Sequence, residues 1–348
     1  MNKVLHIILI TIISLAVISC SSSDDSKTTT SSVSFVAVGT SGTLLTSSDG
    51  TTWTSRTSDT SNHLQRVIYA NSTFVTVGNS GTILTSSDGI SWTSRTSGTT
   101  NTLYGITYGN STFVTVGNSG TILTSSDGTT WTSRTSGTTN DLWGDHYGNS
   151  IFVAVGDSGT ILSSSDGTSW DNRTSGTSYG LQKVFYANSR FMVVGDAGSM
   201  LRSSDGTSWD NSTSQTTANL YGIHYVNSSI VMVGESGNII TSLNDGSDWD
   251  NRTSGTTNHL YGGIYSEKNA MVGASGTVVY TEDNGTSWTS WSASSMTTDV
   301  FGIAYGSSTW VFVGRSGTIY TAGNDDDDVT ARTSGTTESL RRVYYLGE

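Results

Sequence analysis

The chain has 348 residues, a formal net charge of −12 and a single cysteine. The acidic balance and the lack of a basic stripe argue against nucleic acid as a partner, because binding to phosphates depends on clustered lysine and arginine. A lone cysteine excludes disulfides within the chain, so its stability has to come from packing.

Residues 1–19 have the pattern of a signal peptide. Met1 and Lys3 form a short positive region, and the apolar run that follows is too short to span a membrane as a helix. The run ends in Ala-Val-Ile-Ser-Cys, which resembles a bacterial lipobox and makes Cys20 the expected site of lipidation. The alternative is an ordinary secretory peptide in which Cys20 is incidental.

Residues 20–32 are predicted to be the lipidated cysteine and a flexible tether, because serine, threonine, aspartate and lysine make up everything after Cys20. Serine directly after Cys20 favours the outer membrane, and Asp24 with Asp25 resembles the export signal of some surface lipoproteins of the Bacteroidetes. We therefore expect a lipid-anchored protein of the bacterial cell envelope, at the outer membrane or cell surface rather than the inner membrane.

Residues 33–348 repeat a unit of about 39 residues eight times. A glycine that closes a Val-Gly step marks each unit, at Gly39, Gly78, Gly117, Gly156, Gly195, Gly234, Gly273 and Gly314. Each unit holds four short stretches rich in β-branched residues, separated by turn-forming residues. Four strands in a period near 40 predict an all-β fold, an eight-bladed β-propeller of four-stranded blades. A right-handed β-helix is the competing solenoid, but its coils are usually shorter.

Six of the units carry an aspartate-glycine turn ahead of a tryptophan. The pairs are Asp49 and Trp53, Asp88 and Trp92, Asp127 and Trp131, Asp166 and Trp170, Asp205 and Trp209, and Asp283 and Trp288. The last copy closely matches the Asp-box motif, and the whole repeat resembles the Asp-box (BNR-like) propellers, which include photosystem II assembly factors and sialidases. The resemblance implies the propeller fold and a structural box that lies away from the ligand face. It implies no particular activity.

The chemistry of the box suits a hairpin rather than a metal site. The aspartate accepts hydrogen bonds from amides of its own turn, glycine permits positive φ, and the tryptophan packs on the blade. Each turn supplies one carboxylate, whereas calcium takes about six to eight oxygen ligands. The sequence therefore predicts no metal site and no cofactor.

The two ends of the chain predict how the ring closes. The first unit lacks a Leu-x-x-Val-x-Tyr stretch, and Leu340 to Tyr345 supplies one at the C-terminus. We expect this strand to join the N-terminal blade, with the same stretch innermost in every blade, because closure removes exposed strand edges.

The units differ most in this innermost stretch. One position after its leading residue stand Gln65, Tyr104, Trp143, Gln182, Tyr221, Tyr261, Phe301 and Arg341. Two positions after it stand Arg66, Gly105, Gly144, Lys183, Gly222, Gly262, Gly302 and Arg342. Each aromatic residue has glycine beside it, which we interpret as a ring packed over glycine. The turns that follow the Val-Gly steps should share the same rim.

This pattern predicts a channel mouth that binds a ligand. Its candidate residues are the aromatics Tyr104, Trp143, Tyr221, Tyr261 and Phe301, the cations Arg66, Lys183 and Arg342, and an acidic arc of Asp157, Asp196 and Glu235. Such a surface suits a glycan or a protein segment. The alternative is that the rings fill space between blades and the charges are merely solvated.

Asp145 and His146 depart from the pattern, because most units have valine or isoleucine where Asp145 stands. A buried carboxylate is costly unless paired, so Asp145 marks a site, a solvent-lined position or drift in a redundant repeat. A glycoside-active enzyme would use Asp145, Asp157 and His146, with carboxylates about 5–10 Å apart across an open pocket. Burial of Asp145 between blades would argue against it.

The favoured function is a non-catalytic propeller, anchored to the membrane through its lipid, that presents its mouth to a protein or polysaccharide. No catalytic residue is assigned, since the sequence lacks the usual hydrolase and phosphate-binding motifs. The sialidase- or glycosidase-like enzyme, an assembly-factor-like chaperone and a repeat adhesin are the alternatives.

Overall fold

The structure is a computed structural model that describes residues 32–212, 214–226, 229–264, 269–291, 295–323 and 329–347. Residues 1–31 form a separate unit from residues 32–348. The predictions for the signal peptide, Cys20 and most of the tether lie outside the described residues. Within the described ranges, no helix has the length and apolar character needed to cross a membrane.

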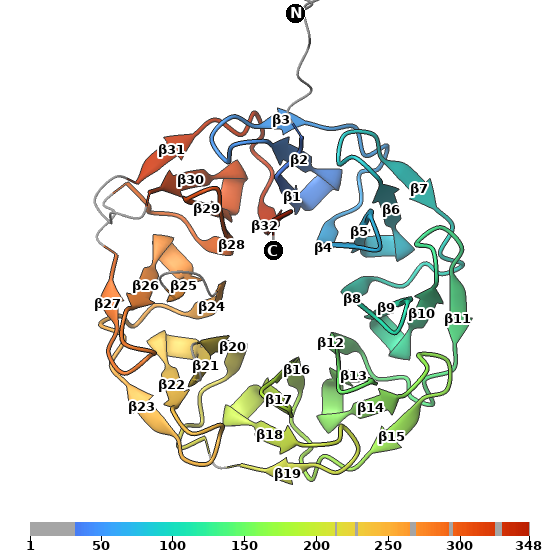
Figure 1. The fold of residues 1–348 in the computed structure, drawn as a ribbon, viewed down its shortest axis with the longest axis vertical. Coiled ribbons are helices and arrows are strands. Elements are labelled where there is room, and N and C mark those ends of the chain that lie inside the picture. Colours follow the sequence, from blue (N-terminus) through green and yellow to red (C-terminus); the bar gives the residue numbers. More distant parts are fainter. Residues whose placement is uncertain are drawn as a thin grey trace, which may run out of the picture. The chain divides into compact units, whose positions relative to one another are not determined.

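The described residues form eight four-stranded antiparallel sheets, arranged as blades around a central axis (Figure 1). The innermost strands are β4 (Leu64–Ala70), β8 (Leu103–Gly109), β12 (Leu142–Gly148), β16 (Leu181–Ala187), β20 (Leu220–Val226), β24 (Leu260–Ile264), β28 (Val300–Gly306) and β32 (Leu340–Tyr345). The second strands are β5 (Thr73–Gly78), β9 (Thr112–Gly117), β13 (Ile151–Gly156), β17 (Arg190–Gly195), β21 (Ser229–Gly234), β25 (Asn269–Gly273), β29 (Thr309–Gly314) and β1 (Phe35–Gly39). The predicted eight-bladed propeller is confirmed.

The outer half of each blade is shorter. The third strands are β6 (Ile83–Ser86), β10 (Ile122–Ser125), β14 (Ile161–Ser164), β18 (Met200–Ser203), β22 (Ile239–Ser242), β26 (Val278–Thr281), β30 (Ile319–Ala322) and β2 (Leu44–Ser47). The outermost strands are β7 (Thr93–Arg95), β11 (Thr132–Arg134), β15 (Asp171–Arg173), β19 (Asp210–Asn211), β23 (Asp250–Arg252), β27 (Thr289–Ser290), β31 (Thr330–Arg332) and β3 (Thr54–Ser55). These short, exposed edge strands limit sheet-to-sheet association.

One-turn 3-10 helices connect the second and third strands. They are η1 (Thr40–Gly42), η2 (Asn79–Gly81), η3 (Asn118–Gly120), η4 (Asp157–Gly159), η5 (Asp196–Gly198), η6 (Glu235–Gly237), η7 (Ala274–Gly276) and η8 (Arg315–Gly317). The middle residue of each has positive φ, for example 52° at Ser41 and 54° at Ser158. These turns place the residues after the Val-Gly steps on one common face of the ring.

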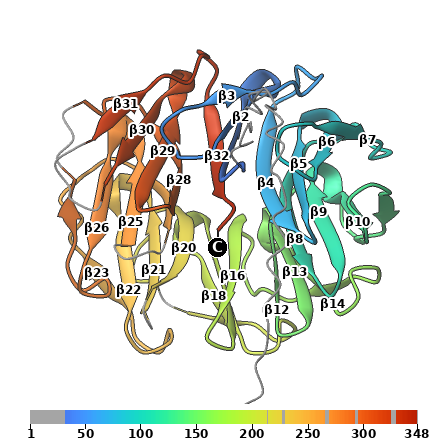
Figure 2. The same ribbon diagram turned by 45° about the horizontal axis from the view of Figure 1, so that its top comes forward.

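The C-terminal strand closes the ring as predicted. β32 pairs with β1, so that Phe35 lies opposite Tyr345 and Ala37 opposite Val343. Figure 2 shows β32, at the red end of the chain, beside the blue strands of the first blade. The first blade therefore combines three strands from the N-terminal end with one strand from the C-terminal end.

The hydrophobic core lies between neighbouring blades. Val75 and Ile83 of one blade share a buried cluster with Leu103 and Phe113 of the next. The ring of Phe113 also lies 6.4 Å from that of Trp131, the tryptophan of its own box. Burial of each such side chain stabilises the fold by about 2 kcal/mol, so that each blade depends on contact with its neighbours.

The Asp-box forms a hydrogen-bonded turn in each predicted copy. In the third unit, Asp127 Oδ1 accepts hydrogen bonds from the amides of Thr129 and Thr130 at 2.8 and 2.9 Å. Trp131 Nε1 donates to the carbonyl oxygen of Gly128 at 2.9 Å, and Gly128 has a φ of 75°. The box is thus a structural element, as the resemblance implied.

The structure adds a box that the sequence analysis did not assign. Asn244 Oδ1 accepts hydrogen bonds from Ser242 Oγ at 3.0 Å and from the amide of Asp248 at 2.8 Å. Trp249, which follows, is buried against the blade. An amide oxygen can therefore replace the carboxylate in this turn.

We expect Asp127→Ala to lower the free energy of unfolding by about 1 kcal/mol, because two amides lose their acceptor. Asp127→Asn should cost less, since it keeps an oxygen where Asn244 has one. Hydrogen bonds from the Thr129 hydroxyl and the Thr130 amide lower the pKa of Asp127, so this stabilisation is present above the ordinary aspartate pKa and fades as the pH falls below it. Urea denaturation at neutral and acidic pH measures both effects. An equal loss in both variants at every pH would contradict this assignment.

Candidate functional site

Every inner strand is irregular one residue after its leading hydrophobic residue. In β4 the pairing with β5 shifts between Leu64 and Arg66, and the other seven blades show the same shift. A β-bulge of this kind leaves one residue outside the ladder and redirects its side chain. The bulged residues are the variable ones: Gln65, Tyr104, Trp143, Gln182, Tyr221, Tyr261, Phe301 and Arg341.

The bulged side chains meet the η turns at one face of the ring, which we call the mouth. Gln65 Nε2 donates to Asn79 Oδ1 at 2.7 Å, and Trp143 Nε1 donates to Asp157 Oδ1 at 2.6 Å. In both cases a bulge of β4 or β12 contacts the turn that follows the next strand. The prediction that the two sets of residues share a rim is confirmed.

Five aromatic side chains stand in two groups at the mouth. The rings of Tyr104 and Trp143 have centroids 4.4 Å apart. Tyr221, Tyr261 and Phe301 form a second group, with successive centroids at 6.3 and 5.8 Å. All five side chains are partly exposed, so the rings pack on one another and still offer surface to a ligand.

The predicted acidic arc lies on three consecutive blades: Asp157 is on the blade of Trp143, Glu235 is on the blade of Tyr221, and Asp196 is on the blade between them. Asp157 accepts the hydrogen bond from Trp143, and Asp196 Oδ1 accepts one from Gln182 Nε2 at 3.1 Å. Glu235 Oε2 accepts one from a backbone amide at 3.2 Å. Because each carboxylate is held by its own blade and is partly exposed, the arc gives this part of the mouth a negative charge.

Polar side chains that were not predicted from the sequence join neighbouring blades at the mouth. His63 Nδ1 accepts the amide of Ser41 at 2.9 Å, and Asp141 Oδ1 accepts the amide of Ser119 at 2.7 Å. Equivalent bonds are made by Asn219 with Ala197, His259 with Ser236, and Asp299 with Ser275. In the sequence, each of these side chains belongs to a polar residue directly before the innermost stretch. Its partner is the amide of the positive-φ residue in an η turn of the neighbouring blade.

The predicted cations line a cavity of the channel. Arg66, Lys183 and Arg342 line one cavity of about 270 Å³, which Tyr261 and Phe301 border on the mouth side of their strands. The three cations come from β4, β16 and β32, which are not all neighbours in the ring. They share this cavity with Tyr261 and Phe301 of the second aromatic group.

Asp145 is buried between blades and does not face an open pocket. Its side chain is 1% exposed, and Oδ1 lies 3.9 Å from Arg66 Nη1. A Cβ atom added to Gly105 would lie 2.2 Å from Asp145 Oδ1, so the carboxyl occupies the space above that glycine of β8. Neither oxygen has a hydrogen-bond partner within the described residues. Burial raises the pKa of Asp145 to about 7, although the Arg66 guanidinium acts to lower it.

The arrangement expected for glycoside hydrolysis is therefore not formed by Asp145, Asp157 and His146. Asp157 is bonded to Trp143 at the rim, whereas His146 packs against Phe185 with centroids 5.2 Å apart. Burial, followed by repulsion from nearby cations, lowers the pKa of His146 to about 4. In the described part of the chain, no group of three His, Cys, Asp or Glu side chains is placed to hold a metal ion.

The glycines beside the aromatics have a different role from the one predicted. A Cβ atom on Gly144 would lie 3.2 Å from the Cα atom of Lys183, and one on Gly302 would lie 3.1 Å from that of Arg342. At these two positions glycine admits the backbone of the next inner strand, whereas Gly105 faces the Asp145 carboxyl and Gly262 faces the His224 imidazole. Close approach of adjacent strands near the axis explains why the bulge can carry a large side chain there.

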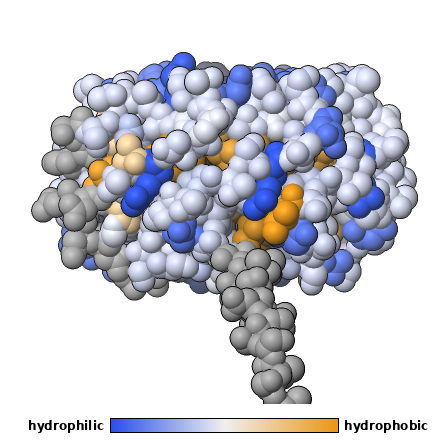
Figure 3. All heavy atoms as spheres, turned by 90° about the horizontal axis from the view of Figure 1, so that it is seen from above, coloured by the Kyte–Doolittle hydropathy of each residue, from blue (hydrophilic) through white to orange (hydrophobic). Residues whose placement is uncertain are grey.

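The outer wall offers little apolar surface. In Figure 3 it is mostly hydrophilic or near neutral, and hydrophobic residues show as small separate areas between polar ones. Within the described ranges, the exposed large hydrophobic residues are Ile90, Tyr179 and Leu243.

Comparison with known proteins identifies a family and a fold. Residues 24–260 match the sequence model of the family described as photosynthesis system II assembly factor YCF48. A solved structure of YCF48 bound to a D1 peptide is 16% identical, with a TM-score of 0.53 over 67% of this chain and 81% of that one. YCF48 from Cyanidioschyzon merolae is 15% identical, with a TM-score of 0.56 over 74% and 94% of the two chains.

The computationally designed protein Ika8 is also similar, at 12% identity, with a TM-score of 0.63 over 82% of this chain and 96% of that one. At such identities the three structures show a common fold. A search of the curated proteins found no match.

Proposed function

The chain belongs to the family of the photosynthesis system II assembly factor YCF48, and we propose that it is a non-catalytic binding propeller whose mouth holds a segment of a partner protein. The observation that carries this proposal is the set of partly exposed rings held at β-bulges on five blades. Rings fixed by the backbone bury a ligand at little entropic cost. The D1 peptide in a solved YCF48 structure supports a peptide as the class of ligand.

The charge at the mouth favours a particular kind of segment. Asp157 shares a blade with Trp143, Glu235 shares a blade with Tyr221, and Asp196 lies on the blade between them. Opposite charges at an interface favour the correct partner and its register. We therefore propose a segment that combines basic residues with apolar or aromatic ones. A polysaccharide is the other candidate ligand, because the same rings can stack on sugars.

Two structural observations support a binding role over glycoside hydrolysis. Asp145 is buried against Gly105, and Asp157 is engaged with Trp143 at the rim. Two catalytic carboxylates would have to face one open pocket from opposite sides of the scissile bond. A chaperone-like or adhesive role would use the same mouth and differ only in the partner that it holds.

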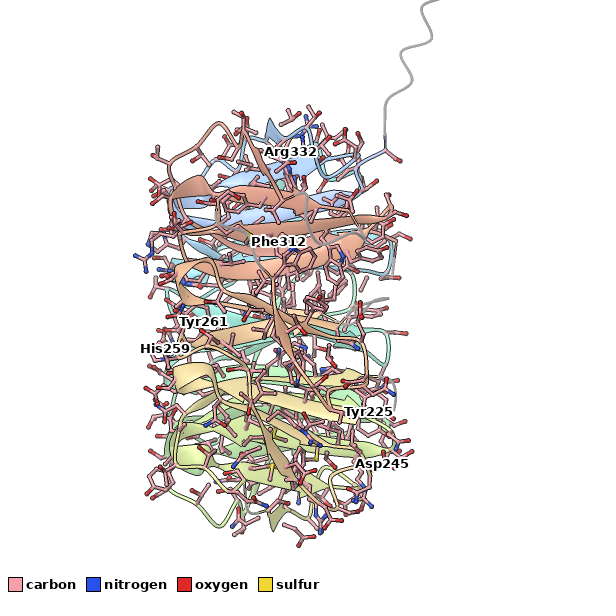
Figure 4. The ribbon with its side chains drawn as sticks, turned by 90° about the vertical axis from the view of Figure 1, so that its left-hand side faces the viewer. Tyr225, Asp245, His259, Tyr261, Phe312 and Arg332 are labelled. Atoms are coloured by element: carbon pink, nitrogen blue, oxygen red, sulfur yellow. The ribbon has the colours of Figure 1, made fainter. Side chains whose placement is uncertain are left out.

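We also propose that Cys20 carries a lipid anchor to the bacterial cell envelope; the first described residues enter the ring on the side opposite the mouth. In Figure 4, Tyr261 and His259 lie at one edge of the ring, and Tyr225 and Asp245 lie at the other. The described chain enters beside its C-terminal end, where the amide of Leu346 donates to the carbonyl oxygen of Ser34 at 2.7 Å. That point lies at the start of β1, whereas the mouth lies at its end. An envelope-anchored protein attached there leaves its mouth free for a partner.

Capture of envelope components by the full chain tests the proposed mouth. The variant carries Tyr104→Ala, Trp143→Ala and Tyr221→Ala together, and we expect it to retain less than about a tenth of the partner, because aromatic anchors often contribute about 2 kcal/mol each. The matched control carries Ile90→Ala and Leu243→Ala, which remove exposed hydrophobic side chains from the box turns. It should capture as much as the unchanged chain.

The class of captured molecule decides the partner. A protein lost only by the mouth variant supports the proposal, and a polysaccharide lost in the same way identifies the other ligand class. Equal capture by the mouth variant and the unchanged chain would move the site away from the mouth. Thermal unfolding of each variant verifies that the ring remains closed.

A further inference from the structure

The inner strands contain more basic than acidic residues, which is the opposite of the balance in the whole chain. The chain as a whole carries a net charge of −12. Within the described inner strands, the basic residues are Arg66, Lys183, Arg341 and Arg342, and the acidic one is Asp145. Several positive charges close to the axis destabilise the folded ring unless negative charge compensates them.

Three of these cations meet in one cavity although they come from distant parts of the ring. The cavity of about 270 Å³ is lined by Arg66, Lys183, His224 and Arg342, among others. Figure 1 shows β4 and β32 side by side and β16 on the far side of the axis. Arg66 and Arg342 therefore approach from one side, and Lys183 approaches from the other.

The protein compensates this group of cations only in part. One of them, Arg66, forms an ion pair with Asp145. Arg66 lies 3.9 Å from the buried Asp145, and Arg342 Nη1 donates to the carbonyl oxygen of Phe301 at 2.9 Å. Desolvation, and then repulsion from Arg66 and Arg342, lowers the pKa of Lys183 to about 7. The cations thus oppose one another across the cavity.

The imidazoles near the cavity stay neutral and add no further charge. His224 Nε2 accepts the amide of Gly263 at 2.9 Å, which leaves Nδ1 as the protonated nitrogen and a hydrogen-bond donor. Burial lowers the pKa of His224 well below its usual value, with further lowering from Lys183 and Arg342. The cavity therefore presents hydrogen-bond donors from several sides, and Asp145, which contacts Arg66, is not among its lining residues.

We propose that this cavity binds a small, doubly charged tetrahedral oxyanion of the phosphate or sulfate class, held by Arg66, Lys183 and Arg342. Guanidinium groups match the oxygens of such an anion in pairs, and the ammonium group of Lys183 adds a point charge. The volume is slightly below that of pockets for drug-sized ligands, which begin at about 300 Å³. The anion would remove the repulsion among the three cations. This inference concerns the channel interior and does not rest on the proposed function of the mouth.

Calorimetric titration of the full chain with sodium sulfate, at constant ionic strength maintained with chloride, tests the site. We expect one saturable site and an affinity at least tenfold lower in Lys183→Met, which keeps an unbranched side chain but removes the charge. Lys183→Arg should bind within about threefold of the unchanged chain, because it restores a cation. Arg190→Met, which removes a cation outside the inner strands, should leave the affinity unchanged.

Parallel titrations with inorganic phosphate and glycerol 3-phosphate distinguish the source of the anion. Tighter binding of the ester indicates a small organic phosphate, and equal binding indicates the free oxyanion. Absence of saturable binding, or equal losses in Lys183→Met and Arg190→Met, would overturn the proposal. Thermal unfolding of Lys183→Met without sulfate shows that any loss of binding is not a loss of fold. Since the mouth variants leave these cations intact, failure here is separate from failure of the partner-capture test.

Discussion

Removal of residues 340–348 is expected to abolish the closed ring. This truncation deletes β32, so that β1 loses its partner along Phe35–Gly39 and becomes an exposed edge. Leu340 is fully buried in a cluster with Phe35 and Ala37. Loss of that one side chain alone costs about 2 to 5 kcal/mol, and the strand also carries a ladder of hydrogen bonds. Since total stabilities are about 5 to 15 kcal/mol, the truncated chain should lack a cooperative transition.

Circular dichroism with urea denaturation and size-exclusion chromatography measure this outcome. The control removes only residues 347–348, which leaves the amide of Leu346 bonded to Ser34 and should preserve stability within about 0.5 kcal/mol. A synthetic peptide of residues 340–346, added in trans, should restore the transition by pairing with β1. A truncated chain that unfolds cooperatively at an unchanged urea midpoint would show that the ring does not depend on this closure.

Replacement of Asp145 by valine is expected to stabilise the protein by about 1 to 4 kcal/mol at pH 8, the range seen when buried ion pairs are replaced by apolar residues. The equivalent residues Val67, Val184 and Val343 show that valine fits this position in other blades. Asp145 has no hydrogen-bond partner within the described residues, and its contact with Arg66 is 3.9 Å long. The ionised Asp145 carboxylate is therefore buried with few favourable interactions to replace its hydration.

The gain from Asp145→Val should depend on pH in a defined direction. Burial raises the pKa of Asp145 to about 7 from an ordinary value near 4, so in this window the unfolded chain ionises while the folded chain stays protonated. The stability of the unchanged protein falls as the pH rises through this window, and the penalty is complete above about pH 7. The variant should therefore gain more at pH 8 than at pH 4.

Urea denaturation of the two proteins at both pH values provides the measurement. Asp210→Val makes the same chemical change on the exposed edge strand β19 and should alter stability by less than about 0.5 kcal/mol at either pH. A loss of stability in Asp145→Val at pH 8 would mean that the carboxylate is satisfied in solution and that Arg66 depends on it.

The local pattern of the sequence predicts the blades because the signals for strands and turns act over a few residues. The second strands, such as Thr112–Gly117, are buried after their first residue and are mostly apolar, whereas the outer strand Thr132–Arg134 is polar and largely exposed. The Asp-box turn is equally local, because Asp127 binds amides two and three residues away. Asn244 escaped assignment only because its turn uses an amide in place of the carboxylate.

The mouth was predicted in part. The identities of the variable residues indicated which side chains gather there, but the backbone bulges that direct these side chains could not be predicted from the sequence. The aromatic residues and the acidic arc were placed correctly at one rim. The bulge that directs Trp143 toward Asp157 has no sequence signature, since glycine, lysine and arginine all follow a bulged residue. The prediction that glycine accommodates an aromatic ring was wrong at Gly144. The space beside Gly144 is taken by the backbone of Lys183 in the next blade, 39 residues away.

The sequence by itself determined the number of blades, the order of strands within them and the strand that closes the ring. These follow from a repeated pattern of apolar stretches and turns, together with one stretch missing at the start and present at the end. Only the tertiary structure decided that Asp145 is buried against Gly105 and that Arg66, Lys183 and Arg342 share a cavity. The physical reason is closure of the ring: it brings side chains from distant repeats to one axis, where contacts depend on the packing between blades and not on the local pattern.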